Sequence, residues 1–295
     1  MSTDIKIIND QTECYSIWNS IVDIKTLYDE WDFRLAFYNS TNPLHFITIF
    51  DNEAPVALLP LQNNTIKGYY EFWGGNFMEN NRIFTKPGFE NLRSTIIESL
   101  PSRTILRCIT PEDLIIQNLP IDDYTYKLNI QDYIDLDSYL AIFNSKHRAN
   151  MLKTLERINS LQPDFSLNDT GNVAKLISLN QQQHGAESLF NDPEIYNAFF
   201  KLLDSKFNIT IQSIIHQDAI QSVSFSITHN NTFYVLMAGS NRDFASGIGT
   251  YEKLKAFEFA ISNKFDYIDF ARADCNWKES WKLEKHPLHI FKNFE

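Results

Sequence analysis

Residues 242–250, RDFASGIGT, have the composition of an anion-binding loop. The loop joins a predicted strand to a predicted helix, and Gly247 and Gly249 stand at the helix start. Glycines let the backbone approach a phosphate closely, and the unpaired N–H groups of a helix start favour an anion. Because the P-loop and GxGxxG patterns are both missing from it, a loop that merely caps an ordinary helix is the alternative interpretation.

A second group of polar residues follows the predicted strand in IDFARADCNWKESWK. Asp269 lies near the end of that strand, where open α/β sheets place their ligands. Asp274, Trp277, Lys278 and Trp281 come directly after it. The alternatives are a cap or salt-bridge role for Asp269 and core packing for the two tryptophans.

Two helical segments add groups for anion binding and proton transfer. Lys146 and Arg148 in SKHRANMLKTLER can hold an anionic substrate, although most charge runs are solvated helix faces. His184 and Glu187 in QQQHGAESLF can form a base and its orienting partner, although a lone helix histidine is more often an ordinary residue. HExxH, CxxC and Gly-x-Ser-x-Gly do not occur, so we expect no metal and no serine hydrolase.

The bulk composition bounds the class of protein. A chain of 295 residues holds one large or two small domains. Its net charge of −11 and the lack of a Lys/Arg run make nucleic acid a poor partner. Three scattered cysteines indicate a reducing compartment. The acidic start MSTDIKIIND is unlike a signal peptide, and no apolar run is long enough for a membrane span, so we expect a cytoplasmic protein.

The two halves of the chain repeat one order of predicted elements. Strands are predicted over 44–50, 55–62 and 66–75, and again over 209–215, 219–228 and 232–240. Each meander is followed by a loop, a helix (89–100 and 249–263) and a strand (102–110 and 265–271). Asp51 precedes Gly74 by the same distance as His216 precedes Gly239. The pattern favours a duplication over chance similarity.

The remaining segments are predicted to be mainly helical. They are helices within 13–37, a strand at 124–130, a linking helix over 137–162 with Asp137 or Ser138 as its N-cap, and a helix pair at 173–185 and 192–207. The predicted fold is α/β (α+β), with two tandem domains over 1–125 and 126–295. Each is expected to be a mixed, mostly antiparallel sheet flanked by helices.

An ordered series of motifs over about residues 139–282 resembles a known family. The series comprises SKHR at 145–148, HGAESLFNDPEIYNAFF, AIQSVSFSI, YVLMAGS, SGIG at 246–249 and IDF…D…WKESWK. It is similar to the GNAT-like acetyltransferase family associated with cellulose biosynthesis. That family is related to the Fem-type peptidyltransferases, which attach amino acids to peptidoglycan precursors. The first half resembles it more loosely, through VALLPL and EFWGG…NRIF.

The resemblance implies two GNAT-like domains and transfer of an acyl group to an amine. Acyl-CoA (acetyl-CoA or a longer thioester) would be the donor, with no metal. The residues implied to bind it are Met237, Ala238, Arg242, Ser246, Gly247, Ile248, Gly249 and Thr250. The loop departs from the usual GNAT signature, because Arg242 stands five residues before Gly247 rather than three. This departure puts the contact with the coenzyme A pyrophosphate in doubt.

Attack by an amine on a thioester needs a base for the amine and N–H donors for the oxyanion. The candidate bases are Asp269, Asp274, His184 and Glu187, and Tyr234 is a candidate for protonating the leaving group. The residues expected to contact the substrate are Lys146, Arg148, Glu187, Trp277, Lys278 and Trp281.

The leading hypothesis is an acyl-CoA-dependent N-acyltransferase whose acceptor is an amine of a sugar, amino acid or small metabolite. One alternative is a Fem-type transferase that uses aminoacyl-tRNA. The acidic net charge disfavours it, since tRNA binding needs a cationic face and residues 146–157 are the one clear candidate. The other alternative is a non-catalytic binding module that kept the fold.

Overall fold

The computed structural model describes residues 3–111, 119–273 and 277–294. Its contacts divide the chain into two compact units. The first unit comprises Met1–Thr125, Arg272–Asp274 and Lys285–Glu295, and the second comprises Tyr126–Ala271 and Cys275–Glu284. Both units are mixed α/β structures, as predicted.

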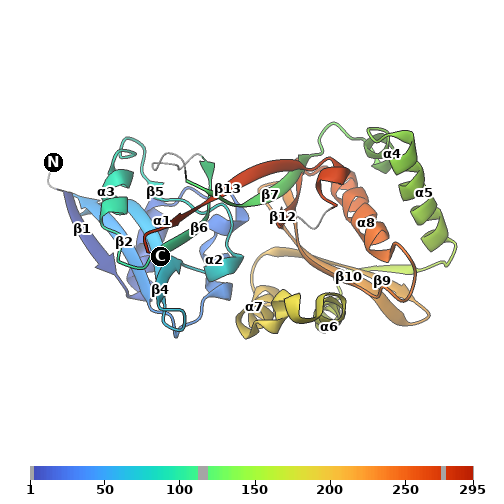
Figure 1. Ribbon diagram of the computed structural model, residues 1–295, viewed down its shortest axis with the longest axis horizontal. Helices are drawn as coiled ribbons and strands as arrows, with labels where there is room; N and C mark the ends of the chain where they lie inside the picture. The colour runs from blue at the N-terminus through green and yellow to red at the C-terminus, as the bar shows by residue number, and fades with distance from the viewer. Residues whose placement is uncertain (1–2, 112–118, 274–276, 295) are drawn as a thin grey trace. The chain divides into compact units, whose positions relative to one another are not determined.

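The first unit contains an antiparallel sheet in the order β1-β2-β3-β4, and β5 also pairs with β3 (Figure 1). The strands are β1 (Thr3–Ile8), β2 (Leu44–Asp51), β3 (Ala54–Asn64), β4 (Tyr69–Phe72) and β5 (Phe84–Thr85). Separately, β6 (Ile105–Ile109) pairs with β13 (Glu284–Lys292). Asn52 and Glu53 both have positive φ in the β2–β3 turn, which is the geometry of a tight hairpin.

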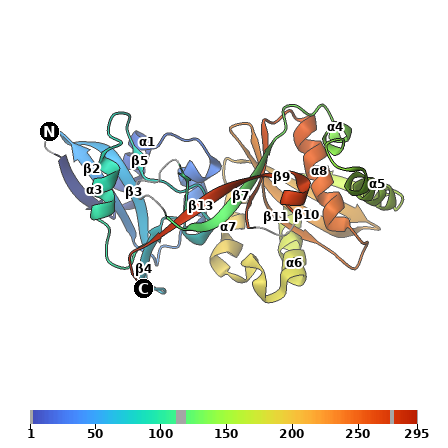
Figure 2. The same cartoon turned by 45° about the horizontal axis from the view of Figure 1, so that its top comes forward.

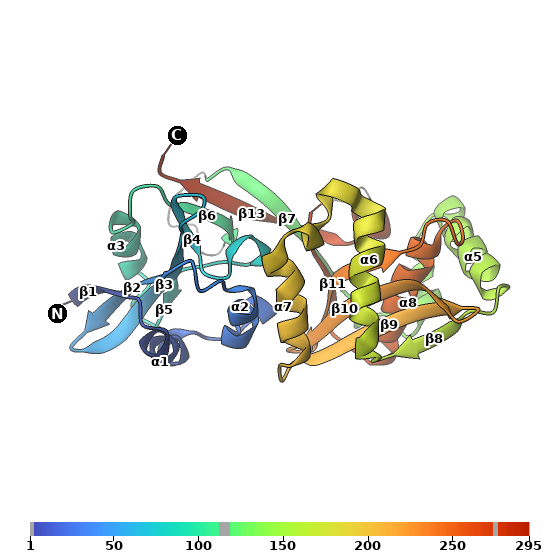
Figure 3. The ribbon, with the colours of Figure 1, turned by 90° about the horizontal axis from the view of Figure 1, so that it is seen from below.

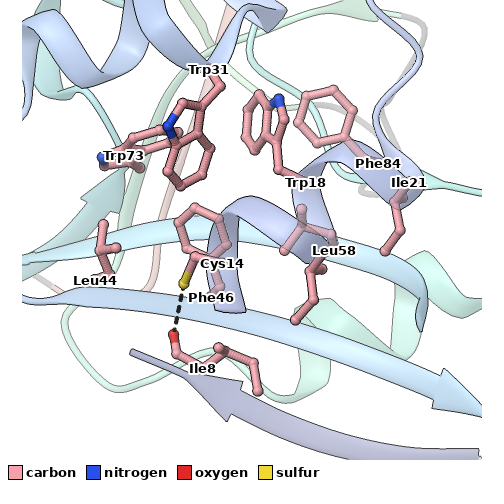
Figure 4. Packing of buried hydrophobic residues seen from close by; sticks show 11 residues of the cluster. Ile8, Cys14, Trp18, Ile21, Trp31, Leu44, Phe46, Leu58, Trp73 and Phe84 are labelled. Carbon is pink, nitrogen blue, oxygen red and sulfur yellow. Dashed lines mark hydrogen bonds between the residues drawn. The ribbon is translucent and has the colours of Figure 1, made fainter. Parts of the chain in front are cut away.

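Helices cover the first sheet and bury an aromatic core. They are α1 (Gln11–Ile21), η1 (Leu27–Asp29), α2 (Trp31–Phe37), η2 (Gly75–Phe77) and α3 (Leu92–Glu98). Figure 4 shows Trp18, Trp31 and Trp73 packed above Phe46. The rings of Trp18 and Trp73 meet edge to face, with centroids 5.5 Å apart. Five of the eleven buried residues of this core are therefore aromatic, in line with the aromatic-rich sequence.

Arg34 is a buried cation that ties four segments of the first unit together. Its guanidinium donates to the carbonyls of Tyr28 and Trp73 and to Oδ1 of Asn81, at 2.6, 2.8 and 2.8 Å. Burial lowers the pKa of Arg34 to about 10, so the side chain stays protonated at neutral pH. Removing it would leave three buried acceptors without their donor.

We expect Arg34→Met to reduce the free energy of unfolding by about 3–5 kcal/mol. Arg107→Met is the matched control, because the side chain of Arg107 is 49% exposed and its pair with Asp122 is open to solvent on the arginine side. That substitution should cost less than about 1 kcal/mol. Urea denaturation of the two variants measures the difference. Equal losses would contradict the assigned role of Arg34.

The second unit is built on strands in the order β7-β12-β11-β10-β9-β8. They are β7 (Ile121–Asn129), which begins in the first unit, β8 (Asp164–Leu167), β9 (Asn208–His216), β10 (Ala219–His229), β11 (Thr232–Ser240) and β12 (Tyr267–Arg272). The strands from β8 to β11 are antiparallel, and β11 pairs with β12 in parallel. The turns at 217–218 and 230–231 again have positive φ at both residues, which confirms the predicted hairpins.

Two helical layers enclose this sheet, with α6 and α7 on one face and α5 and α8 on the other (Figures 1 and 3). The helices are α4 (Leu136–Leu140), α5 (Ser145–Asn159), η4 (Thr170–Asn172), α6 (Val173–His184), η5 (Gly185–Glu187), η6 (Leu189–Asn191), α7 (Pro193–Leu203), α8 (Ile248–Ser262) and η7 (Glu279–Trp281). No helix within the described residues is long and apolar enough to span a membrane.

The linking helix differs from the prediction of one helix over 137–162. The side chain of Asn144 accepts the N–H of His147 and starts α5, so the chain breaks between α4 and α5. The N-cap of α4 is Asp135, whose Oδ1 accepts the N–H of Ser138, and the predictions of Asp137 or Ser138 as N-cap were wrong.

The predicted repeat of strand order is present in both units, but the two copies differ in size. Strand β4 has 4 residues against 9 in β11, and α3 has 7 against 15 in α8. The matching glycines, Gly74 and Gly239, are needed for different structural reasons. Gly74 has φ +91°, which favours glycine. A Cβ on Gly239 would instead lie 2.7 Å from the backbone N of Asn180 and O of Leu176, so glycine allows α6 to touch the sheet.

Candidate active site

The parallel strands β11 and β12 separate soon after they begin. They pair only from Thr232 to Tyr234 on β11, opposite Tyr267 to Asp269 on β12. From Val235 to Ser240, no strand in the described part of the chain pairs with β11 on that side. Met237 and Ala238 are half-exposed although they lie within the sheet. The second unit therefore has an opening in its strand pairing along the edge of β11.

The backbone of β11 turns alternate amides toward this opening. The N–H of Asn241 donates to the carbonyl of Gln221 on β10 at 2.8 Å. Because N–H groups alternate in direction along a strand, those of Ala238 and Ser240 point away from β10. Leu236 is an extra residue in a bulge, because Phe225 pairs with Met237 and Ser226 with Val235.

Side chains of α6 meet β11 along the open edge. Asn180 donates to the carbonyl of Ala238 at 2.7 Å, and Gln183 accepts the N–H of Ser240 at 3.2 Å. Asn180 is in turn fixed by the hydroxyl of Ser188, 2.7 Å from its Oδ1. Within the described residues, the amide of Ala238 has no acceptor, whereas pairing with Phe225 turns the amide of Met237 toward β10.

Helix α8 begins at the end of the predicted anion-binding loop. Its N-cap is Gly247, with φ +83°, and no side chain caps the helix. Ile248 donates to the carbonyl of Ala245, whereas the amides of Gly249 and Thr250 have no acceptor in the described part of the chain. These two N–H groups give the helix start the polarity that attracts an anion.

Two cations lie beside this helix start. Arg157 of α5 donates from Nη2 to the carbonyl of Ser246, and Nη2 lies 2.8 Å from where a Cβ on Gly247 would be. Lys253 donates to the carbonyl of Gly249 at 2.9 Å. Side chains thus border the loop at Gly247, while an added Cβ on Gly249 would meet no atom nearer than 3.7 Å.

Arg242 belongs to the surroundings of His184. Arg242 is exposed and close enough to His184 to lower its pKa, after burial as the larger cause, while Glu187 raises it. His184, Glu187 and Arg242 therefore form one exposed group at the end of α6. Arg157, which lies far from the loop in sequence, contacts the loop through the carbonyl of Ser246.

Asp269 is a buried carboxyl group on β12, directly beside Tyr234 of β11. Its Oδ1 accepts the N–H of Ala271 at 2.7 Å. Burial raises the pKa of Asp269 to about 6, against the lowering effects of that hydrogen bond, of Lys278 and of Lys127. A carboxyl group with a pKa near 6 can exchange a proton close to neutral pH, which is what a general base requires.

The other predicted substrate contacts differ in burial and in their neighbours. Lys278 is buried, and its Nζ donates to the carbonyls of Phe270 and Ala271 at 2.8 and 2.9 Å. Trp281 is buried and stacked on Phe257 at 5.7 Å, which favours core packing over ligand stacking. Trp277 is half-buried, 4.8 Å from Nζ of Lys253.

Lys146 and Arg148 lie in the first turn of α5, about 16 and 13 Å along the helix from Arg157. The structure does not bring them to the start of α8. Asp274 lies outside the described residues. No group of three or more His, Cys, Asp or Glu side chains suited to a metal ion occurs where the structure describes the chain.

Comparisons with known proteins bear on the class to which this fold belongs. Residues 145–279 match the family model described as an acetyltransferase (GNAT) domain, and this match supports an acyltransferase. The matched segment contains α5, α8, β11 and Asp269. The description makes no reference to cellulose.

Solved structures of similar fold cover nearly the whole chain. FemX aligns with a TM-score of 0.60 at 8% identity, covering 100% of this chain and 98% of that one. The C-terminal domain of a putative lysylphosphatidylglycerol synthetase from Agrobacterium fabrum gives 0.63 at 8%, covering 97% and 93%. A tandem GNAT protein from the clavulanic acid pathway gives 0.57 at 9%, covering 100% and 99%. These likenesses confirm two GNAT-like domains. No curated protein sequence matches the chain.

Proposed function

We propose that the second unit transfers an acyl group from acyl-CoA to an amine of a small molecule. The observation that carries the proposal is the start of α8, where the amides of Gly249 and Thr250 lie beside the cations of Arg157 and Lys253. A helix start with adjacent cations favours a phosphorylated ligand such as the pyrophosphate of coenzyme A.

The acyl end of the donor would lie along the open edge of β11. There the amide of Ala238 faces the opening and can donate to the thioester oxygen as negative charge develops on it. The amine nitrogen attacks the carbonyl carbon, the new C–N bond forms, and the C–S bond breaks to release the coenzyme thiolate. Tyr234 is the candidate for returning a proton to that sulfur.

Asp269 is the preferred candidate for the base that takes the proton from the amine. With a pKa of about 6, it is mostly ionised at pH 7 and can accept that proton. His184 and Glu187 are exposed at the end of α6, and they are the second choice because Asp269 lies where β11 and β12 separate.

The rival donor is aminoacyl-tRNA, and two observations favour it. The fold resembles FemX along the whole chain, and Lys146, Lys153 and Arg157 are exposed on α5. The net charge of −11 counts against it, because tRNA binding relies on a cationic surface.

Thermal unfolding with each donor tests the proposal. A donor present at about 100 times its Kd should stabilise the protein by about 2.7 kcal/mol. We expect acetyl-CoA or a longer acyl-CoA to raise the Tm and aminoacylated tRNA to leave it unchanged. A shift with aminoacylated tRNA alone would assign the rival donor, and no shift with any acyl-CoA would contradict the proposal.

Arg157 gives a separate prediction about donor affinity. Arg157→Ala should raise the Kd for acyl-CoA about 5- to 20-fold, because it removes a charge-assisted hydrogen bond of about 1–2 kcal/mol. Lys153→Ala, a cation to alanine change one turn away on α5, should change the Kd less than about twofold. Isothermal titration calorimetry compares the two, and equal effects would mean that only overall charge matters.

A further inference from the structure

Strand β1 is an open edge of the sheet in the first unit. It pairs with β2 on one side, and it ends the strand order β1-β2-β3-β4 (Figures 1 and 2). Its residues from Thr3 to Ile7 are all exposed. An edge strand presents unpaired N–H and C=O groups that another strand can use, and many proteins block such edges.

One face of β1 is apolar and uncovered. Ile5 and Ile7 are 41% and 52% exposed, although they sit opposite Ile49 and Ile47 of β2, which are buried. Opposite residues of an antiparallel pair point to the same face of the sheet. The core beneath β2 therefore ends in an exposed strip of two isoleucines at the sheet edge.

The other face of β1 has charges that complement a second copy of the same strand. Asp4 and Lys6 point to this face, with side chains 65% and 53% exposed and 3.6 Å between their charged groups. If two β1 strands pair antiparallel with Ile5 opposite Ile5, Asp4 of each copy lies opposite Lys6 of the other. Shifting by two residues instead places Asp4 opposite Asp4 or Lys6 opposite Lys6, so the charges select one register.

We propose that the chain forms a two-fold homodimer by antiparallel pairing of β1 with β1 of a second copy. The pairing joins two sheets into one and satisfies the open backbone edge. It places Ile5 opposite Ile5 and Ile7 opposite Thr3 of the other copy, so the two apolar strips become continuous. Each residue contact occurs twice because the interface is isologous.

Charge reversal tests the dimer by analytical ultracentrifugation at high micromolar concentration. The wild-type chain should sediment as a dimer. Asp4→Lys and Lys6→Asp should each raise the dimer Kd at least about tenfold, since each places like charges opposite one another twice. An equimolar mixture of the two variants should recover the dimer, and so should the double variant Asp4→Lys/Lys6→Asp.

Strand β8 offers a matched control at the edge of the other sheet. Phe165 and Leu167 are exposed on β8 to a similar extent, 43% and 45%. Phe165→Lys should leave the dimer intact. The proposal is overturned by a monomeric wild type, by a mixture that stays monomeric, or by loss of the dimer in Phe165→Lys. Acyl-transfer activity does not enter this test.

Discussion

Replacement of Asp269 by asparagine is expected to lower kcat by about 10²–10⁴, the usual contribution of a positioned base. In the wild type, kcat/KM should rise with pH through about 6 and then level off, because burial raises the pKa of Asp269 to about that value and only the ionised form accepts a proton. Asp269→Asn should remove this rise. Initial rates measured across pH values check both effects.

The stability of the variant separates catalysis from folding. Because the pKa of Asp269 is raised from 3.8 to about 6 on folding, its protonated form favours the native state. That stabilising contribution is complete below pH 3.8 and is lost as the pH rises through 6. At pH 7 the buried ionised form therefore lowers the free energy of unfolding by roughly 2–3 kcal/mol. The free energy of unfolding of Asp269→Asn at pH 7 should therefore be no lower than that of the wild type.

Asp266→Asn provides the matched control. Asp266 precedes the same strand, is half-buried, and accepts a hydrogen bond from Gln131 at 2.6 Å. The same substitution there should leave the pH profile unchanged. An unaltered pH–rate profile in Asp269→Asn would remove Asp269 from the list of bases and direct attention to His184.

Gly247→Val is expected to weaken acyl-CoA binding at least about tenfold. The left-handed φ of +83° is unfavourable for valine, and a Cβ would lie 2.8 Å from Nη2 of Arg157 and 2.9 Å from Cγ2 of Thr154. The loop must move, and the amides at the start of α8 move with it. Calorimetric titration with acyl-CoA measures the change.

Gly88 of the first unit is the control for Gly247, because it has a similar left-handed backbone but lies outside the proposed donor site. Gly88 has φ +88° and no atom within 4 Å of an added Cβ, and it stands in the equivalent loop. Gly88→Val should reduce stability by a similar strain but leave donor affinity unchanged. Gly249→Val should also weaken binding, because its branches would crowd the free amides. Unchanged affinity in folded Gly247→Val and Gly249→Val would show that the loop is only a connector.

Local sequence patterns predicted most of the elements of the fold. Alternating apolar residues predicted the strands of both meanders, and turn residues marked the hairpins at 52–53, 217–218 and 230–231. The repeat of these patterns predicted two similar units, although residues 65–68 form a longer connection in the first. The break before α5 was missed because Asn144 interrupts an otherwise helical pattern. Strand β13 was not assigned, since its pairing with β6 joins segments far apart in the chain.

The candidate site was predictable only in part, for the same reason. Gly247 and Gly249 could be recognised because a strand, a loop and a helix follow one another in sequence. The contact of Arg157 with the loop depends on the packing of α5 against α8, where Ile158 and Tyr251 share one core. Asn180 likewise reaches Ala238 only through the packing of α6. Contacts between segments that are distant in sequence cannot be predicted from local sequence patterns.

A crystal structure of the protein grown with acetyl-CoA tests the central claim most directly. We predict density for the pyrophosphate within hydrogen-bond distance of the amides of Gly249 and Thr250, with the acetyl group beside Ala238 at the open edge of β11. Donor density at another site, or full occupancy of those two amides by protein atoms while acetyl-CoA binds elsewhere, would contradict the account.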